Sequence, residues 1–99
     1  MRISTVEARN ERRLVLEGKL IAPWTTELKS ACEKARENLQ GRELVVDLKN
    51  VTNIDQEGEN LLAALMNEGI KFRSCGVFTK QVLRQVARRA RSRPQKPIS

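Results

Sequence analysis

The residues of this chain that could take part in chemistry or recognition gather in one acidic turn before an apolar helix. The candidate partner-binding residues are Asn53, Asp55, Gln56, Glu57, Gly58 and Asn60. At the start of a helix the backbone amides are unpaired and, with the helix dipole, they place about half a positive charge there. We therefore expect Asp55 to be the N-cap, accepting from amides near Glu57 and Gly58, with the carboxylate of Glu57 beside the same positive end.

Two explanations of this turn remain open. Acidic residues in the first turn of a helix are common and contribute about 0.3–1 kcal/mol each, so composition alone favours a purely structural cap. A docking site would instead use the charge of Glu57 and the hydrogen-bonding groups of Asn53, Gln56 and Asn60. In a docking site Gly58 would leave the backbone open to a close approach by a partner.

The chain lacks the residues that many enzyme mechanisms need. It contains no histidine and no tyrosine, which excludes His-based acid, base and nucleophile activation. Neither a Gly-x-x-x-x-Gly-Lys phosphate loop nor a Gly-x-Gly-x-x-Gly fingerprint occurs. Cys32 and Cys75 are not in the close pairs of a zinc or redox motif, and we expect each to be a small buried residue. The prediction is a protein that is not an enzyme and has no cofactor and no metal site.

Positive charge is concentrated in the C-terminal third of the chain. The net charge is +7, and residues 69–99 hold nine Lys or Arg and no acidic residue. A candidate basic patch on the last predicted helix consists of Arg84, Arg88, Arg89 and Arg91. Basic residues late in a helix commonly complement its negative end. The alternative is a functional face for an acidic protein, nucleic acid phosphates or an anionic membrane.

Hydrophobic periodicity predicts the elements that position the turn. Residues 2–8 suit a weak edge strand, and a hairpin turn leads into a half-buried strand over residues 12–20, where Gly18 marks a bulge or a close approach. A helix begins around Pro23, carries an apolar face as far as Leu39 and ends at Gly41. The spacing of Trp24 and Leu28 predicts that Trp24 packs in the core.

The second half of the chain repeats a strand-helix pattern. An apolar run at residues 44–48 predicts a strand covered on both faces, which a loop joins to a helix over residues 56–68. A short strand over residues 70–75 and a helix over residues 79–91, with Thr79 as its N-cap, complete the order.

This order predicts an α/β fold, a mixed four-stranded sheet with helices packed mainly on one face. We expect a single domain over residues 1–91 and a disordered basic tail over residues 92–99. No apolar run is long enough to span a bilayer and the first residues do not form a secretory signal, so the expected location is cytoplasmic.

Residues 43–61, ELVVDLKNVTNIDQEGENL, resemble the signature segment of the STAS family, the anti-sigma factor antagonist domains. In that family a partner kinase phosphorylates the hydroxyl residue just before the glycine, and here that phospho-acceptor position is Glu57, which is not phosphorylatable. The resemblance therefore implies that phosphorylation switching is absent or altered. Thr52 is an alternative phospho-acceptor or a threonine that holds a turn together. The element order over residues 12–91 is also similar to the STAS fold, with a truncation at the C-terminal end, where the family commonly adds a strand and a helix.

The resemblance implies a non-enzymatic protein-protein interaction module of bacterial signalling and transcription regulation. Its partner would be an anti-sigma factor or a kinase-like regulator that binds the turn. STAS domains also serve as transporter subunits, which is a related alternative. A small nucleic-acid-binding protein that uses the Arg-rich helix is the alternative from another class.

Overall fold

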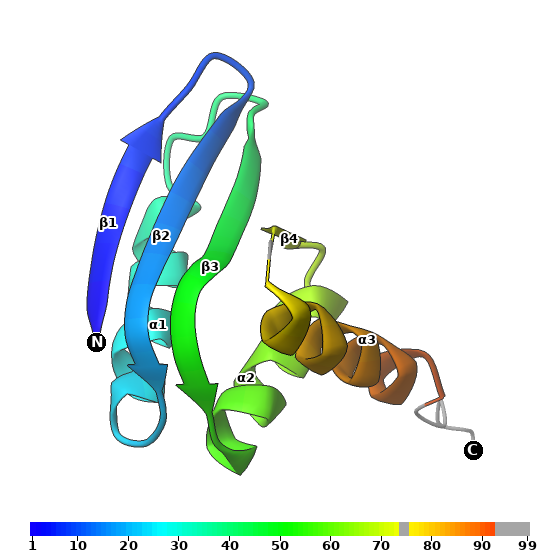
Figure 1. The fold of residues 1–99 in the computed structure, drawn as a ribbon. Coiled ribbons are helices and arrows are strands. Elements are labelled where there is room, and N and C mark those ends of the chain that lie inside the picture. The colour runs from blue at the N-terminus through cyan, green and yellow to red at the C-terminus, as the bar shows by residue number, and fades with distance from the viewer. Residues whose placement is uncertain (74–75, 93–99) are drawn as a thin grey trace.

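The computed structural model describes residues 1–73 and 76–92, with side chains up to residue 88. The elements are β1 (Arg2–Glu7), β2 (Glu11–Leu20), α1 (Trp24–Ala35), β3 (Glu43–Ile54), α2 (Gln56–Asn67), β4 (Lys71–Arg73) and α3 (Val77–Ser92), as Figure 1 shows. Their order confirms the predicted α/β class. The predicted tail, residues 92–99, lies outside the described residues except for Ser92, which ends α3.

One mixed sheet of four strands, in the order β1-β2-β3-β4, organises the molecule. β1 pairs antiparallel with β2, whereas β2, β3 and β4 run parallel. The carboxyl ends of β2 and β3 therefore meet at one edge of the sheet, and α1 and α2 both begin there (Figure 1). This arrangement brings the β2–α1 and β3–α2 connections together.

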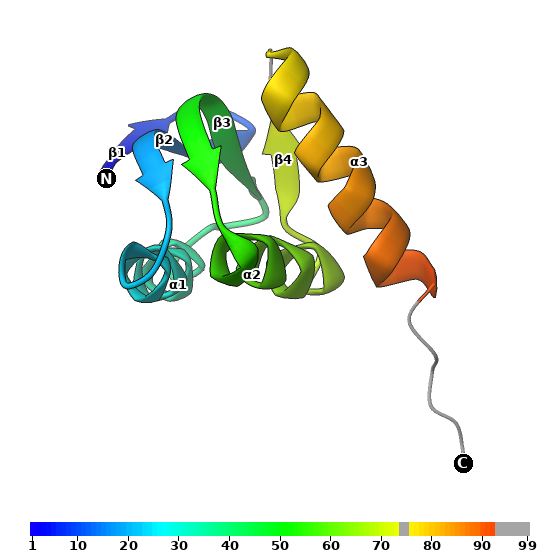
Figure 2. The same cartoon turned by 60° about the horizontal axis from the view of Figure 1, so that its bottom comes forward.

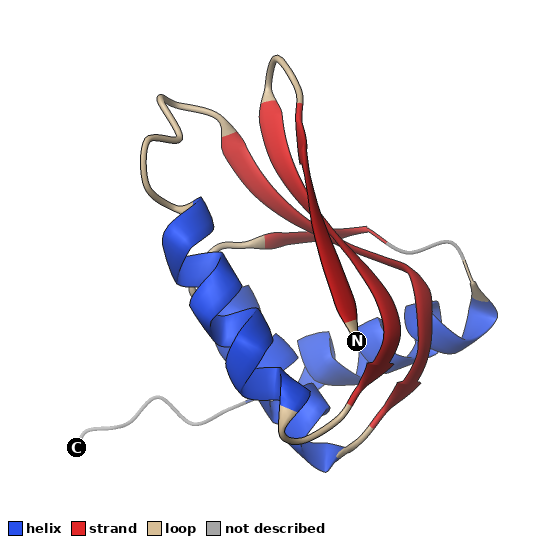
Figure 3. Ribbon diagram, turned by 90° about the vertical axis from the view of Figure 1, so that its left-hand side faces the viewer, coloured by secondary structure: helices blue, strands red, loops and turns tan. Residues whose placement is uncertain are grey.

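The helices lie mainly on one side of the sheet. α1 and α2 lie side by side against one face, and α3 lies at the β4 side, where it packs on α2 (Figure 2). Figure 3 shows the sheet with α1 on one side and no cover from α1 or α2 on the other. Among the described residues, no helix has the length and apolarity needed to cross a membrane.

The core lies between the sheet and the helices. In β2 the predicted alternation is confirmed, because Leu14, Leu16 and Leu20 are all fully buried. The register with β3 shifts on either side of Gly18, whose φ is 104°, so the predicted irregularity there is also confirmed. Cys32 is buried as expected, and burial raises the pKa of its thiol to about 11. Cys75 lies outside the described residues.

Several predicted boundaries are wrong. β3 extends to Ile54, so the segment expected to be a loop before α2 is mostly strand paired with β2. α1 ends at Ala35 rather than at Gly41, since the positive φ of Asn38, 59°, is incompatible with a continuing helix, and Arg12 donates 2.8 Å hydrogen bonds to the carbonyls of Ala35 and Glu37 there. Thr79 is not an N-cap: α3 begins at Val77, and the Thr79 hydroxyl donates to the carbonyl of Gly76 at 3.3 Å.

Candidate functional site

Asp55 organises the edge where β2 and β3 end. It is the N-cap of α2, as predicted, with the amide of Gly58 donating to its Oδ1 at 2.8 Å. Its Oδ2 accepts from the amide of Ala22 at 3.1 Å, and its own amide donates to the carbonyl of Leu20 at 3.3 Å. One carboxylate therefore fixes the start of α2 and the β2–α1 connection in a single arrangement.

Gly58 has a role that differs from the expected one. It is buried, and a Cβ at this position would lie 2.5 Å from the carbonyl oxygen of Leu20 and 2.9 Å from Cγ2 of Ile54. The open backbone expected for a partner is wrong, because the end of β2 already fills that space. Glycine is required here so that α2 can pack closely on the sheet.

Glu57 is exposed in the first turn of α2. It lines an open hollow of about 300 Å³ between α1 and α2, together with Thr25, Thr26, Lys29, Asn60 and Leu61. The carboxylate thus stands at the positive end of the helix and is accessible from outside. A partner that carries hydrogen-bond donors or a cation could contact it without any rearrangement.

The other predicted residues of the turn divide into two groups. Gln56 and Asn60 are exposed on α2, and the Gln56 side-chain amide donates to Oδ1 of Asn60 at 3.1 Å. Asn53 and Thr52 are exposed on β3 rather than in a loop. The Thr52 hydroxyl donates to the carbonyl of Gly18 at 3.3 Å, which is the structural use that the sequence left open.

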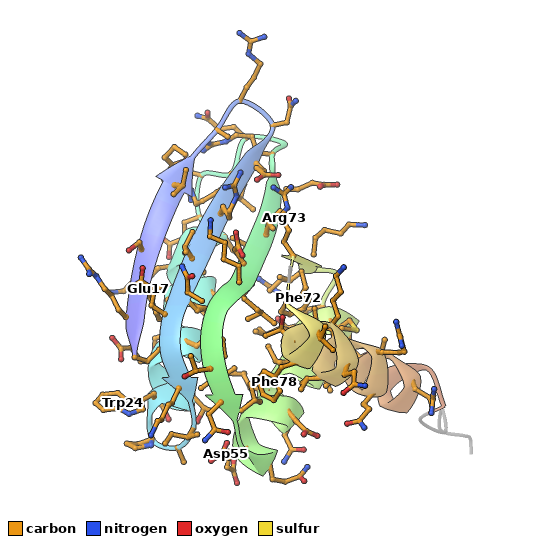
Figure 4. All side chains as sticks on the ribbon, viewed as in Figure 1. Glu17, Trp24, Asp55, Phe72, Arg73 and Phe78 are labelled. Carbon is orange, nitrogen blue, oxygen red and sulfur yellow. The ribbon has the colours of Figure 1, made fainter. Side chains whose placement is uncertain are left out.

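Trp24 is a candidate that sequence reasoning placed in the core, and that placement is wrong. Its side chain is 43% exposed, whereas Leu28, one turn later, is fully buried. Trp24 is the first residue of α1, one turn before the buried stripe of the helix begins. Figure 4 shows Trp24 and Asp55 at the same end of the molecule. The sequence did contain a signal for this exposure, because Trp24 directly follows the N-cap Pro23 and precedes the first buried residue of the helix, Leu28.

The candidate basic patch is separate from this edge. Arg84 and Arg88 are exposed on α3, and the side chains of Arg89 and Arg91 lie outside the described part of the chain. α3 lies at the β4 side of the sheet, while α1 lies against β1 and β2 (Figures 1 and 2). No group of three His, Cys, Asp or Glu side chains suited to a metal ion occurs among the residues that the structure describes.

Comparison with solved structures identifies the architecture. The anti-sigma factor antagonist SpoIIAA, in its unphosphorylated form, superposes with a TM-score of 0.61 at 12% sequence identity, covering 92% of this chain and 99% of that chain. The chain has the STAS fold. The resemblance first drawn from residues 43–61 is thereby confirmed at the level of the fold.

A second structure contains the same fold as part of a larger chain. The crystal structure of Mglu matches with a TM-score of 0.57 at 19% identity over 74% of this chain, which spans only 19% of the length of Mglu. No protein-family model and no curated protein matches the sequence. The STAS fold therefore rests on the coordinates rather than on sequence similarity.

Proposed function

We propose that this STAS domain is a non-enzymatic protein-interaction module that binds its partner at a docking edge, defined as Trp24, Asn53, Gln56, Glu57 and Asn60. The observation that carries the proposal is the exposed Glu57 at the start of α2, in a turn that Asp55 holds rigid. A pre-ordered turn loses little conformational entropy on binding. The likeness to an anti-sigma factor antagonist supports a protein partner, and we propose an anti-sigma factor or a kinase-like regulator in a bacterial cytoplasm.

Trp24 adds an anchor to this edge. Tryptophan is enriched among the few residues that dominate binding energy in protein interfaces, because it buries a large apolar area at a low entropic cost. Trp24 is the sole tryptophan and one of the exposed large apolar residues of the described chain. We assign it the apolar contact of the docking edge, at the same end of the molecule as the first turn of α2 (Figure 4).

Glu57 gives the docking edge a fixed charge. At neutral pH a glutamate carries about −1, less than the roughly −2 that phosphorylation adds. We propose that the domain is not switched at this position and keeps one binding state. Glu57→Ser would create a hydroxyl at the phospho-acceptor position, and it would become phosphorylated if the cell contains the cognate kinase.

Affinity purification from the source cell tests the docking edge. We expect the tagged domain to recover a partner that Trp24→Ala or Glu57→Lys weakens at least tenfold, in line with a hot-spot cost of about 2 kcal/mol. Val6→Ala, at another exposed apolar side chain, and Glu33→Lys, at another exposed helical glutamate, are the matched controls and should retain it. Equal recovery by all four variants would refute the docking edge.

The identity of what co-purifies separates the remaining functions. An anti-sigma factor or kinase-like protein supports the proposal, and a transporter ATPase would favour a transporter subunit. Nucleic acid that is released steeply by salt, and lost on Arg84→Glu with Arg88→Glu, would favour the basic helix. Both arginines are exposed on α3, so the substitutions test that face directly.

A further inference from the structure

A second surface lies in the groove between β4, the end of α2 and α3, which we call the β4–α3 groove. Its volume is about 500 Å³, and its floor is formed by Met66, Ile70, Phe72, Leu83 and Ala87. Figure 4 shows Phe72 on β4 beside the start of α3. The floor is thus apolar and comes from the end of α2, the α2–β4 connection, β4 and α3.

The rim of the groove is cationic. Lys71, Lys80 and Arg84 are exposed along it, and none of the described residues that line it is acidic. Among the described residues none of these three side chains forms an ion pair, whereas Arg13 and Arg73 pair with Glu11 on the neighbouring sheet surface. Three uncompensated cations around an apolar floor favour an occupant that carries carboxylates beside apolar side chains.

The position of the groove favours an extended occupant. β4 is a strand of three residues at the end of the sheet, and among the described residues it pairs with β3 alone. Extended segments commonly bind beside such edges, where backbone hydrogen bonds supply affinity and alternate side chains enter the adjacent groove. The chain's own residues 93–99 are a poor occupant, because they carry Arg93 and Lys96 and no acidic residue.

We propose that the β4–α3 groove binds an extended acidic segment of a partner protein, in which Asp or Glu alternates with large apolar residues. This site is distinct from the docking edge. Glu57 lies in the first turn of α2 and Met66 in its last turn, about 14 Å apart along the helix axis. A partner can therefore bind each surface independently, and a negative result at one surface leaves the proposal for the other unaffected.

Fluorescence anisotropy tests the proposal on the full chain. The probe is a short labelled peptide in which Asp and Glu alternate with Leu and Phe. We expect it to bind, and we expect Lys80→Glu with Arg84→Glu to weaken binding about tenfold or more, because two attractive rim charges become repulsive. Lys34→Glu with Lys49→Glu is the matched control, since both lysines are exposed, lie outside the groove and change the net charge equally.

Three peptide or nucleotide controls decide what the groove recognises. A peptide with Asn and Gln in place of the acids, and one with Ser in place of Leu and Phe, should both bind at least tenfold more weakly. If the control variant weakened peptide binding equally, the loss would reflect general charge attraction, and the proposal would be overturned.

Tighter binding of a DNA oligonucleotide that competes with the peptide would also overturn the proposal, in favour of nucleic acid. Trp24→Ala should leave peptide binding unchanged, which separates this result from the docking edge.

Discussion

Asp55 is the residue on which the geometry of the docking edge most depends. Its two carboxylate oxygens accept from the amides of Gly58 and Ala22, so the side chain spans two connections that are far apart in the sequence. A glutamate would place its carboxylate one methylene farther out. The short side chain of aspartate is therefore suited to capping α2 while it also holds the residue before Pro23.

Asp55→Ala should lower the free energy of unfolding by about 1–2 kcal/mol, since it removes an N-cap and a second hydrogen bond. Asp55→Asn keeps an acceptor oxygen and should lose less. Glu57→Gln, which removes a first-turn charge from an exposed side chain that makes no hydrogen bond within the described residues, is the control and should cost only a few tenths of a kcal/mol. Urea denaturation measures all three, and an Asp55→Ala value equal to that of the control would show that the cap contributes nothing.

The change in stability expected for Gly58→Ala has the opposite sign to the one that helix propensity predicts. In an open helix Gly→Ala stabilises by about 0.5–1 kcal/mol. At Gly58 the added methyl would meet the Leu20 carbonyl, so we expect destabilisation by about 1–3 kcal/mol. Asn60→Ala, at an exposed position of the same helix, should be neutral or stabilising. A more stable Gly58→Ala protein would mean that α2 is not packed closely on the end of β2.

The capping role of Asp55 could be predicted from the sequence, whereas the packing around the turn could not. The N-cap at Asp55 followed from local rules, because an acidic residue before an apolar helix has few alternatives. The burial of Gly58 and the exposure of Trp24 depend on where the end of β2 lies relative to both helices. Their relative position is set by tertiary packing, which the periodicity of a single segment does not predict.

At the scale of elements, Glu7 and two arginines connect β1 to the end of α1. Arg42 donates to Oε1 of Glu7 at 2.7 Å and Arg12 to its Oε2 at 3.0 Å, while Arg12 also donates to the last carbonyls of α1. The carbonyls that a helix end leaves unpaired are thus satisfied from the neighbouring strand. β1, β2 and the loop before β3 are joined at one point.

Hydrogen bonds from Arg42, and then from Arg12, hold the pKa of Glu7 below its ordinary value of 4.5. A lowered folded-state pKa contributes stability that is present above the unfolded value and is lost as the pH falls through the folded value. The stability difference between wild type and Glu7→Gln should therefore shrink as the pH falls below 4.5, and shrink further in high salt because Glu7 is exposed. A Glu17→Gln control should show a smaller change, and a difference that does not vary with pH would contradict this ion-pair role.

The order of elements was predictable because each strand and helix carries its own period. Leu14, Leu16 and Leu20 at period two and the stripe of α2 at helical spacing are local patterns. The extension of β3 to Ile54 was not, because polar residues at 49, 50, 52 and 53 break the apolar run, and this part becomes strand by pairing with residues 17–20 of β2. Element lengths thus depend on partners that the sequence does not place side by side.

At the scale of the whole molecule, two surfaces of different chemistry lie at the two ends of α2. The docking edge combines Trp24, a carboxylate and neutral amides, whereas the β4–α3 groove is apolar with a cationic rim. The net charge of +7 should raise the rate of encounter with an acidic partner at low salt. Specificity would then come from the docking edge, where an aromatic side chain and hydrogen-bonding groups contribute to recognition as well as charge.

Site-specific photo-crosslinking in the source cell tests the docking edge most directly. A photoreactive phenylalanine analogue is placed in turn at Trp24, Glu57, Val6 and Glu33, all of which have exposed side chains. We expect positions 24 and 57 to crosslink to the same partner protein, and positions 6 and 33 not to crosslink to it. Crosslinks to that partner from positions 6 or 33, with none from 24 and 57, would contradict this expectation.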